Sequence, residues 1–289
     1  MQIIESLDEV MARYDALFVD LWGCLHNGRE VFPEAADALR VARGAGLTVV
    51  LVTNSPRTRD RVAEQLDRFG VPRDCWDTIA TSGDSARVAM YTGAVGTRVH
   101  HIGPDTDLPF FTPPEILPDP LAIERVALDE AEGLVVTGPF HDETDRPEDY
   151  RGTFLAAKQR GLKLLCANPD IIVDRGETRV ICAGALAAEY TEMGGTSLYF
   201  GKPHPPIYDL ARRRLIEHRG EDTPNVLCIG DGIATDIMGA MGEDLDSLFI
   251  TGGLAAEETG TRHQPDPAKL EAYLAEVMMS PTYAIGKLR

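Results

Sequence analysis

The stretch Asp15–Gly28, DALFVDLWGCLHNG, decides the fold that we predict for this chain. Its apolar run at residues 16–19 has no polar face, which is typical of a strand buried on both faces of a sheet. The run stops at Asp20, and Gly23 and Gly28 then allow a tight turn. Ligands of open parallel α/β sheets bind outside the carboxyl ends of the strands, so Asp20 is the first candidate functional residue. The alternative is a helix cap, but the next predicted helix begins well beyond this turn.

The composition indicates a globular chain with a strong acidic excess. Its 289 residues, 44% of them hydrophobic, suffice for one large or two ordinary domains. The 46 acidic and 28 basic residues give a formal net charge of −18. The only basic run, residues 212–214, lies on a predicted helix between acidic residues. We therefore expect neither a nucleic acid nor an anionic membrane surface as a partner.

The cysteines and the first residues indicate the compartment. The five cysteines are scattered without a CxxC pair, so neither a zinc site nor a disulfide framework is indicated, and buried thiols fit a reducing compartment. The segment MQIIESLDEV carries acids where a signal peptide needs bases, and no apolar stretch is long enough to span a membrane. We expect a cytoplasmic protein.

Strand and helix patterns alternate along the chain. A short amphipathic helix is predicted at residues 3–14, and a Pro at its start and a Gly at its end delimit a second helix at 33–44. Further buried strands are expected at 47–52, 225–229 and 245–250, and further helices at 56–70, 207–217 and 266–276. This alternation is typical of right-handed βαβ units. The predicted fold is therefore α/β, with a doubly wound, mostly parallel sheet as its core.

The pattern changes in the middle of the chain. Residues 81–195 have their own alternation of short strands and helices, interrupted by a Pro-rich connector at 104–120, and the opening pattern then resumes. We expect residues 1–80 and 196–289 to form the core and residues 81–195 to form a smaller inserted α/β domain.

Polar residues at four strand or loop ends form a chemically coherent set. They are Asp20, Thr53 with Asn54, Lys202, and Asp231 with Asp236. Each has an ordinary alternative, such as a capping box, a surface lysine or a first-turn helix acid. Together, carboxylates suit Mg²⁺, whereas lysine, hydroxyl groups and helix N-termini suit a phosphate dianion. A carboxylate can also attack phosphorus and form an aspartyl-phosphate.

In order and spacing, these motifs resemble subclass IIA of the haloacid dehalogenase (HAD) superfamily of aspartate-nucleophile hydrolases. The motif D-x-D-G-(T/V) matches DLWGC at 20–24, and the second motif matches the strand that ends in TNS at 53–55. The lysine motif matches GKPHP at 201–205, and G-D-x-x-x-T-D matches GDGIATD at 230–236. The resemblance implies a HAD-like Rossmannoid core and a C2-type cap, a kind of cap that often mediates homodimers in this subclass.

The resemblance also implies a metal site and a nucleophile. Asp20 would be the nucleophile and a ligand to Mg²⁺. The backbone carbonyl of Trp22 and the side chain of Asp231 would be further ligands. Asp236 would hold the waters of the metal or bind it directly.

A phosphate site is implied in the same way. Thr53 and the backbone of Asn54 would bind the phosphoryl oxygens, and Lys202 would neutralise charge on the nucleophile and the phosphate. The cap residues expected to roof the site are Asn168, Asp170 and Gly184.

Trp22 departs from the pattern of the resembled family. Phosphatases of that family usually carry at this position an Asp that acts as general acid and base, and an indole N–H does not titrate. Such a group typically contributes ~10²–10⁴-fold to the rate. His26, on the same turn, could substitute for it, although a structural hydrogen bond within the turn is the alternative.

Three functions remain open from the sequence. The first is a Mg²⁺-dependent phosphatase of a small phosphorylated metabolite, with acid–base catalysis weakened or relocated. The second is a non-catalytic homologue that binds a phosphorylated ligand as a sensor, which Trp22 alone favours. The third is a haloacid dehalogenase-type enzyme, which attacks carbon without a metal. The acids at 231 and 236 argue against the third.

Overall fold

The computed structural model describes residues 1–175 and 178–289. The chain divides into two units, each with its own sheet. We name them the core unit, formed by Met1–Thr53, Ala63–Ala80 and Tyr208–Arg289, and the cap unit, formed by Asn54–Val62 and Thr81–Ile207.

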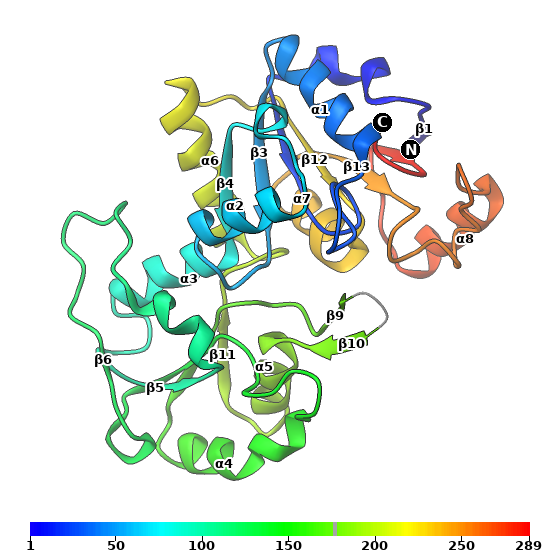
Figure 1. Ribbon diagram of the computed structural model, residues 1–289. Coiled ribbons are helices and arrows are strands. Elements are labelled where there is room, and N and C mark those ends of the chain that lie inside the picture. The colour runs from blue at the N-terminus through cyan, green and yellow to red at the C-terminus, as the bar shows by residue number, and fades with distance from the viewer. Residues whose placement is uncertain (176–177) are drawn as a thin grey trace. The chain divides into compact units, whose positions relative to one another are not determined.

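A seven-stranded sheet forms the centre of the core unit, in the order β1-β14-β13-β12-β2-β3-β4 (Figure 1). Its strands are β1 (Gln2–Ile3), β2 (Ala16–Val19), β3 (Thr48–Thr53), β4 (Thr78–Thr81), β12 (Val226–Gly230), β13 (Asp246–Ile250) and β14 (Tyr283–Ile285). Strand β2 pairs in parallel with both β12 and β3. Every residue of these three strands is buried, as expected of a parallel sheet that is covered on both faces.

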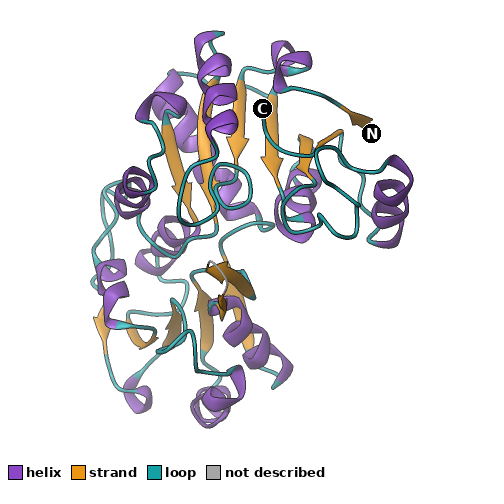
Figure 2. Ribbon diagram, turned by 45° about the vertical axis from the view of Figure 1, so that its right-hand side comes forward, coloured by secondary structure: helices purple, strands orange, loops and turns teal. Residues whose placement is uncertain are grey.

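Helices lie in front of and behind the strands of this sheet (Figure 2). They are α1 (Pro33–Gly44), α2 (Arg59–Arg68), α6 (Pro205–Arg219), α7 (Met238–Gly242) and α8 (Pro267–Glu276). The chain proceeds outward from β2 to β4 on one side and from β12 to β14 on the other. The predicted α/β fold with a doubly wound parallel sheet is therefore confirmed. None of the helices in the described part of the chain has the length and apolar character that a membrane crossing requires.

The prediction of a helix at residues 3–14 is wrong. Residues 2–3 form the edge strand β1, which pairs with β14, and two short 3₁₀ helices follow at Leu7–Glu9 and Met11–Arg13. Ile4 N donates a hydrogen bond to Ala284 O at 3.0 Å. Pairing with a strand from the far end of the chain overrides the local helical pattern.

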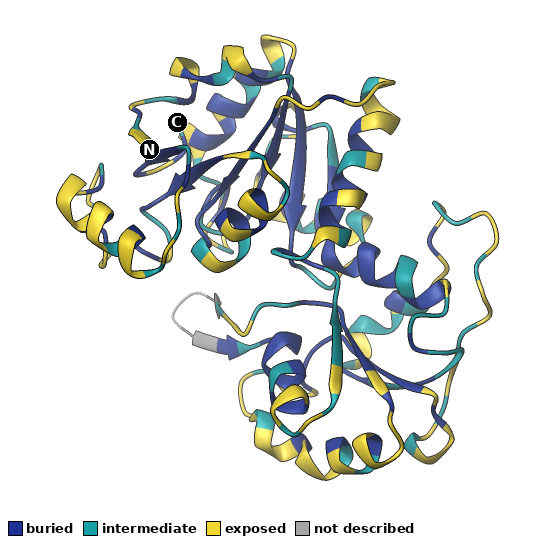
Figure 3. Cartoon of the chain, turned by 180° about the vertical axis from the view of Figure 1, so that it is seen from behind, coloured by how far each residue is buried: buried dark blue, intermediate teal, exposed yellow. Residues whose placement is uncertain are grey.

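A five-stranded parallel sheet forms the centre of the cap unit, in the order β11-β8-β7-β5-β6. Its strands are β5 (Arg98–Ile102), β6 (Glu124–Arg125), β7 (Gly133–Val136), β8 (Lys163–Cys166) and β11 (Thr196–Tyr199), and its helices are α3 (Ser82–Tyr91), α4 (Arg151–Gln159) and α5 (Ala183–Glu192). β9 (Ile172–Arg175) and β10 (Thr178–Ile181) pair antiparallel. In both units the central strands are largely buried, and exposed residues gather on the outer faces of the helices (Figure 3).

One boundary between the units lies at the predicted 80/81, whereas the second lies at 207/208 instead of the predicted 195/196. The segment at 196–199, expected in the core, is strand β11 of the cap sheet, with Leu198 opposite Leu165 of β8. Residues 54–62 also belong to the cap unit. Gly83 N, at the start of α3, donates to Ser55 O at 3.0 Å, and Arg59 N donates to a carboxylate oxygen of Asp84 at 3.1 Å.

Candidate active site

Two carboxylates stand where the strand order of the core sheet reverses. Asp20 directly follows β2 and Asp231 directly follows β12, and these two strands are neighbours. Asp20 N donates to Ile229 O at 2.8 Å, which continues the strand pairing up to the acid. Ligands of doubly wound sheets bind at such a switch point. The topology therefore brings together two acids that are far apart in the sequence.

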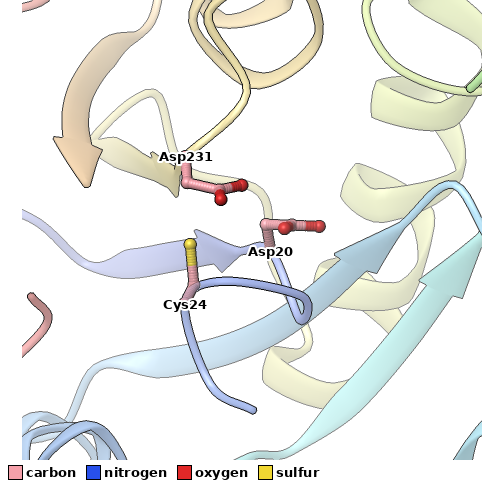
Figure 4. Close-up of side chains that lie close together, drawn as sticks. All are labelled: Asp20, Cys24 and Asp231. Carbon is pink, nitrogen blue, oxygen red and sulfur yellow. The ribbon is translucent and has the colours of Figure 1, made fainter. Parts of the chain in front are cut away.

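A thiol lies beside these two carboxylates. Cys24 Sγ and one carboxylate oxygen each of Asp20 and Asp231 all lie within 4.8 Å of one another, and the three residues are buried. Figure 4 shows the three side chains together, with Cys24 on the turn that follows β2. Within residues 1–175 and 178–289, this is the one group of His, Cys, Asp and Glu side chains placed closely enough to share a metal ion. Its two carboxylates fit Mg²⁺, which commonly takes one or two of them.

Two glycines enclose the carboxylate of Asp231. A Cβ added to Gly23 would lie 2.1 Å from Asp231 Oδ2, and one added to Gly253 would lie 2.0 Å from the same atom. Gly23 also has a φ of +75°, a conformation that favours glycine. Leu254 N donates to Asp231 Oδ2 at 3.1 Å. The fold itself therefore orients this carboxylate, as metal ligands require.

Asp236 is held by the turn in which it lies. Gly232 N donates to Asp236 Oδ2 at 3.0 Å, and a Cβ on Gly230 would lie only 2.1 Å from its Cγ. Ile233–Ile237 form a single π-helical turn, a feature frequent at functional sites. These contacts indicate that Asp236 shapes the segment that presents Asp231.

Thr53 and Asn54 fall into different units. Thr53 is the last residue of β3, which pairs with β2, so it ends at the same edge of the core sheet as Asp20. Asn54 opens the cap unit. Both side chains are buried.

Within the cap unit, Asn54 binds the backbone of Lys202. Its Oδ1 accepts from Lys202 N at 2.7 Å, and its Nδ2 donates to Lys202 O at 3.1 Å. The same Nδ2 donates to Asp170 Oδ1 at 2.8 Å, and Asp170 N donates to Asn168 Oδ1 at 3.0 Å. Four predicted site residues thus form one hydrogen-bonded cluster.

Glycines bring the loops of this cluster together. Gly184 N donates to Asp170 O at 3.1 Å, and a Cβ on Gly184 would lie 2.1 Å from Pro169 O. A Cβ on Gly201 would lie 2.5 Å from Asn54 Oδ1. Gly184, singled out by its position in the cap, is therefore a close-packing residue of this cluster.

The turn after β2 is closed by aromatic packing. A Cβ on Gly28 would lie 2.4 Å from the ring of Trp22, whose centroid lies 5.5 Å from that of His26 in an edge-to-face contact. His26 packs against Phe69 in the same way at 5.0 Å. Gly28 N donates to His26 Nδ1 at 3.0 Å. Burial lowers the pKa of His26 to about 4, so its imidazole is neutral at neutral pH.

Reasoning from the sequence missed three contributors to this site. The cysteine pattern predicts Cys24 only as a buried thiol, although its place on the turn that follows Asp20 is a usable signal. Gly253 and Leu254 follow β13, and only the strand order shows that this loop reaches Asp231.

Comparisons with known proteins show what the chain as a whole is similar to. Residues 17–112 match a family model described as haloacid dehalogenase-like hydrolase, and residues 199–277 match a second one described as HAD-hydrolase-like. A crystal structure of a haloacid dehalogenase-like hydrolase from Brucella suis is 40% identical, with a TM-score of 0.85, and covers 99% of this chain and 100% of that one.

Two characterised relatives have phosphatase names. The 5′-nucleotidase of Bacillus subtilis is 26% identical over 96% of this chain and 97% of its own length. A glycerol phosphate phosphatase from Mycobacterium tuberculosis, solved in complex with magnesium, is 25% identical, with a TM-score of 0.68 over 97% of this chain and 77% of that one.

Proposed function

The chain belongs to the haloacid dehalogenase-like hydrolases as a phosphatase-type enzyme, and on that premise we propose that it hydrolyses a small phosphomonoester through a covalent intermediate on Asp20. The observation that carries this proposal is the pair of buried carboxylates, Asp20 and Asp231, at the switch point of the core sheet. One carboxylate would serve as nucleophile, and both would hold the metal ion. The phosphatase names of the relatives support the reaction class.

The reaction has two steps at one phosphorus atom. A carboxylate oxygen of Asp20 attacks the phosphorus, the bond to the ester oxygen breaks, and the departing alkoxide takes up a proton from solvent. Water then attacks the phosphorus of the aspartyl-phosphate and gives a proton to solvent, and the break of the acyl-phosphate P–O bond releases phosphate and restores the carboxylate.

The metal is Mg²⁺, and Asp20 and Asp231 would hold it with the backbone carbonyl of Trp22. When bound, it supplies positive charge for the phosphoryl oxygens and the nucleophile. Asp231 is already oriented by Leu254 N and the flanking glycines. Asp236 fixes the turn that carries Asp231 and would hold waters of the ion.

Thr53, Asn54 and Lys202 provide the phosphate site in this proposal. The hydroxyl of Thr53 and the backbone N–H of Asn54 bind phosphoryl oxygens, and the ammonium of Lys202 neutralises their charge. The side chain of Asn54 fixes the Lys202 backbone through the two hydrogen bonds described above. Positioning and charge are what a loose phosphoryl-transfer transition state requires.

Acid–base help from this turn is weak. Trp22 cannot titrate, and His26 uses Nδ1 for Gly28 N and has a pKa of about 4. We infer that His26 has a structural role and that turnover is slower than with an acid at position 22. Substrates whose leaving group needs no proton should therefore be favoured.

The relatives suggest the first substrates to test. One is named for 5′-nucleotides and the other for glycerol phosphate. A nucleoside 5′-monophosphate, glycerol phosphate and 4-nitrophenyl phosphate therefore form the smallest useful panel.

Trp22 favours one alternative, a phosphorylated-ligand sensor without turnover. Its ring packs on Gly28 at the position where the resembled family has its acid. Ligand binding would then be retained in the absence of hydrolysis.

The test is phosphate release from this panel with and without Mg²⁺. Wild type should require the ion, and Asp20→Asn should be inactive. Asp8→Asn, at an exposed position on the short helix Leu7–Glu9, should match wild type. Mg²⁺-dependent release that persists in Asp20→Asn would contradict the covalent route. Ligand binding by wild type with no release from any substrate would support the sensor.

A further inference from the structure

The sulfur of Cys24 has no role in the proposed phosphatase chemistry, yet it shares the centre of the site. Its Sγ lies within 4.8 Å of ligand oxygens of both Asp20 and Asp231, and its side chain is 1% exposed. In Figure 4 the sulfur points to the side on which the two carboxylates lie. The group therefore offers two oxygen donors and one sulfur donor.

The turn that carries Cys24 is built to bring the sulfur there. Gly23, with its φ of +75°, reverses the chain directly before Cys24. Gly23 N donates to His26 O at 3.0 Å, and Leu25 N donates to Leu21 O at 2.8 Å. These bonds on either side of Cys24 fix its backbone, so the thiol does not depend on a flexible loop to reach the carboxylates.

A donor set of two carboxylates and one thiol has different affinities for different divalent ions. Mg²⁺ prefers oxygen ligands and gains nothing from a thiol. Zn²⁺ and Cd²⁺ bind thiolate sulfur strongly, at about 2.3 Å for Zn–S and about 2.0–2.2 Å for Zn–O. Donor atoms no more than 4.8 Å apart can reach those distances with small side-chain rotations. Two carboxylates and one thiolate also leave the fourth tetrahedral position open for water or substrate.

We propose that Cys24 makes this centre a binding site for thiophilic divalent cations of the Zn²⁺ class, which compete with Mg²⁺ for Asp20 and Asp231. On binding, the thiol gives its proton to solvent and the sulfur forms a bond to the ion. The bound ion displaces the Mg²⁺ on which the proposed hydrolysis depends, so Zn²⁺ inhibits. The binding rests on the side-chain geometry alone, and the inhibition rests on the proposed function.

Cd²⁺ is the probe that tests the binding without any assay of activity, because a cadmium–thiolate bond absorbs in the ultraviolet. Wild type titrated with Cd²⁺ should gain this absorption with one ion per chain. Cys24→Ser should lose this absorption and bind Zn²⁺ at least about tenfold more weakly. Loss of a residue that only supports a metal ligand already costs about tenfold in affinity, so loss of a ligand should cost at least as much. Mg²⁺ affinity should be unchanged in that variant.

Cys75→Ser is the matched control. Cys75 is equally buried but donates to Pro72 O at 3.1 Å and lies outside the metal-ligating group. It should keep the full Cd²⁺ absorption. Absorption that survives in Cys24→Ser, or its absence in wild type, would overturn the inference.

A second measurement needs no variant. Excess Mg²⁺ added to Cd²⁺-loaded wild type should remove the thiolate absorption, because both ions use the same carboxylates. Absorption that resists saturating Mg²⁺ would place the thiol at a separate site and overturn the competition. If the absorption behaves as expected but no phosphomonoester is hydrolysed with Mg²⁺, the proposed function fails and the thiophilic site stands.

Discussion

Trp22 and His26 together build the turn that follows the candidate nucleophile. The indole covers Gly28, and the imidazole lies between Trp22 and Phe69 while its Nδ1 accepts from Gly28 N. Both rings thus pack on neighbours and hold the backbone between residues 20 and 28. This explains how a bulky aromatic residue fits where the resembled family has an acid.

The first prediction concerns His26. His26→Asn places an amide oxygen near the position of Nδ1 and can keep the hydrogen bond from Gly28 N. If the role is structural, kcat should fall by much less than the ~10²-fold that the loss of a general acid or base typically costs. Steady-state kinetics across pH would measure this. A loss of that size with an unchanged melting temperature would make His26 an acid–base residue.

The second prediction concerns Trp22. Trp22→Asp supplies the missing carboxyl, with a gain of at most ~10²–10⁴-fold in kcat, offset by loss of the indole packing on Gly28. Glycerol phosphate, whose leaving group needs a proton, should gain more than 4-nitrophenyl phosphate. The variant must first be shown to fold by circular dichroism. Equal gains for both substrates would mean that the new carboxyl does not protonate the leaving group.

At the scale of elements, strand ends place the acids and loop glycines orient them. Strands β2 and β12 bring Asp20 and Asp231 together, whereas the loop after β13 supplies Gly253 and the N–H of Leu254 to Asp231. The proposed metal site therefore depends on three strands of one sheet.

The third prediction tests this dependence. Gly253→Ala would put a Cβ 2.0 Å from Asp231 Oδ2, so the carboxylate must move and Mg²⁺ affinity should fall about tenfold or more. Gly242→Ala is the control, because nothing lies within 4 Å of its added Cβ. Calorimetric titration with Mg²⁺ compares the two variants. Equal affinities would show that the loop gives way without disturbing the ligand.

In the cap unit, a half-buried histidine links β5 to the end of β7. His101 Nε2 lies 3.0 Å from Thr137 Oγ1, and the ring packs against Phe111. Burial, reinforced by the charge of Arg125, lowers the pKa of His101 from 6.5 to about 4. Between these values the unfolded chain binds a proton that the folded chain does not, so the contribution to stability is complete above pH 6.5 and is lost as the pH falls toward 4.

The fourth prediction follows from that titration. His101→Gln keeps a polar group near Nε2 and cannot titrate, so the free energy of unfolding should fall less on acidification than in wild type. The difference should reach roughly 3 kcal/mol across this window. Urea unfolding near pH 6.5 and near pH 4 measures it, with the exposed His141→Gln as control. Parallel losses in wild type and His101→Gln would show that His101 titrates as it does in the unfolded chain.

At the scale of the whole molecule, the chain carries a net charge of −18 and gathers carboxylates at the candidate site. A cation there relieves repulsion between Asp20 and Asp231, and a phosphoryl group needs the cation in order to approach them. Ligands of the site should therefore stabilise the native protein only in combination with Mg²⁺.

The fifth prediction uses beryllofluoride, which mimics a phosphoryl group on an aspartate. With Mg²⁺ it should raise the Tm of wild type by several degrees, because a ligand at 100 times its Kd adds about 2.7 kcal/mol to the stability. Asp20→Asn should abolish the shift. Differential scanning calorimetry measures it, and a shift retained in that variant would exclude Asp20 as the phosphorylated residue.

The sequence by itself determined most elements of the core and the motif residues. The largely apolar runs at 16–19 and 225–229 predict strands that are buried on both faces, and the structure has buried strands there. Pro33 and Gly44 delimit α1 as predicted. These features are local, since burial on both faces and helix ends leave their marks within a few residues. The motif order then indicated the family before any geometry was known.

The tertiary structure decided which of these residues meet. Three features depend on pairings between segments that are distant in the sequence. They are strand β1, the place of β11 in the cap sheet, and the contact of Asn54 with Lys202. The same holds for the enclosure of Asp231 by Gly23 and Gly253, and for the approach of Cys24 to both carboxylates. Local sequence patterns encode secondary-structure propensity and burial. Side chains from distant segments come within a few ångströms of one another only when strand order and turn geometry bring those segments together.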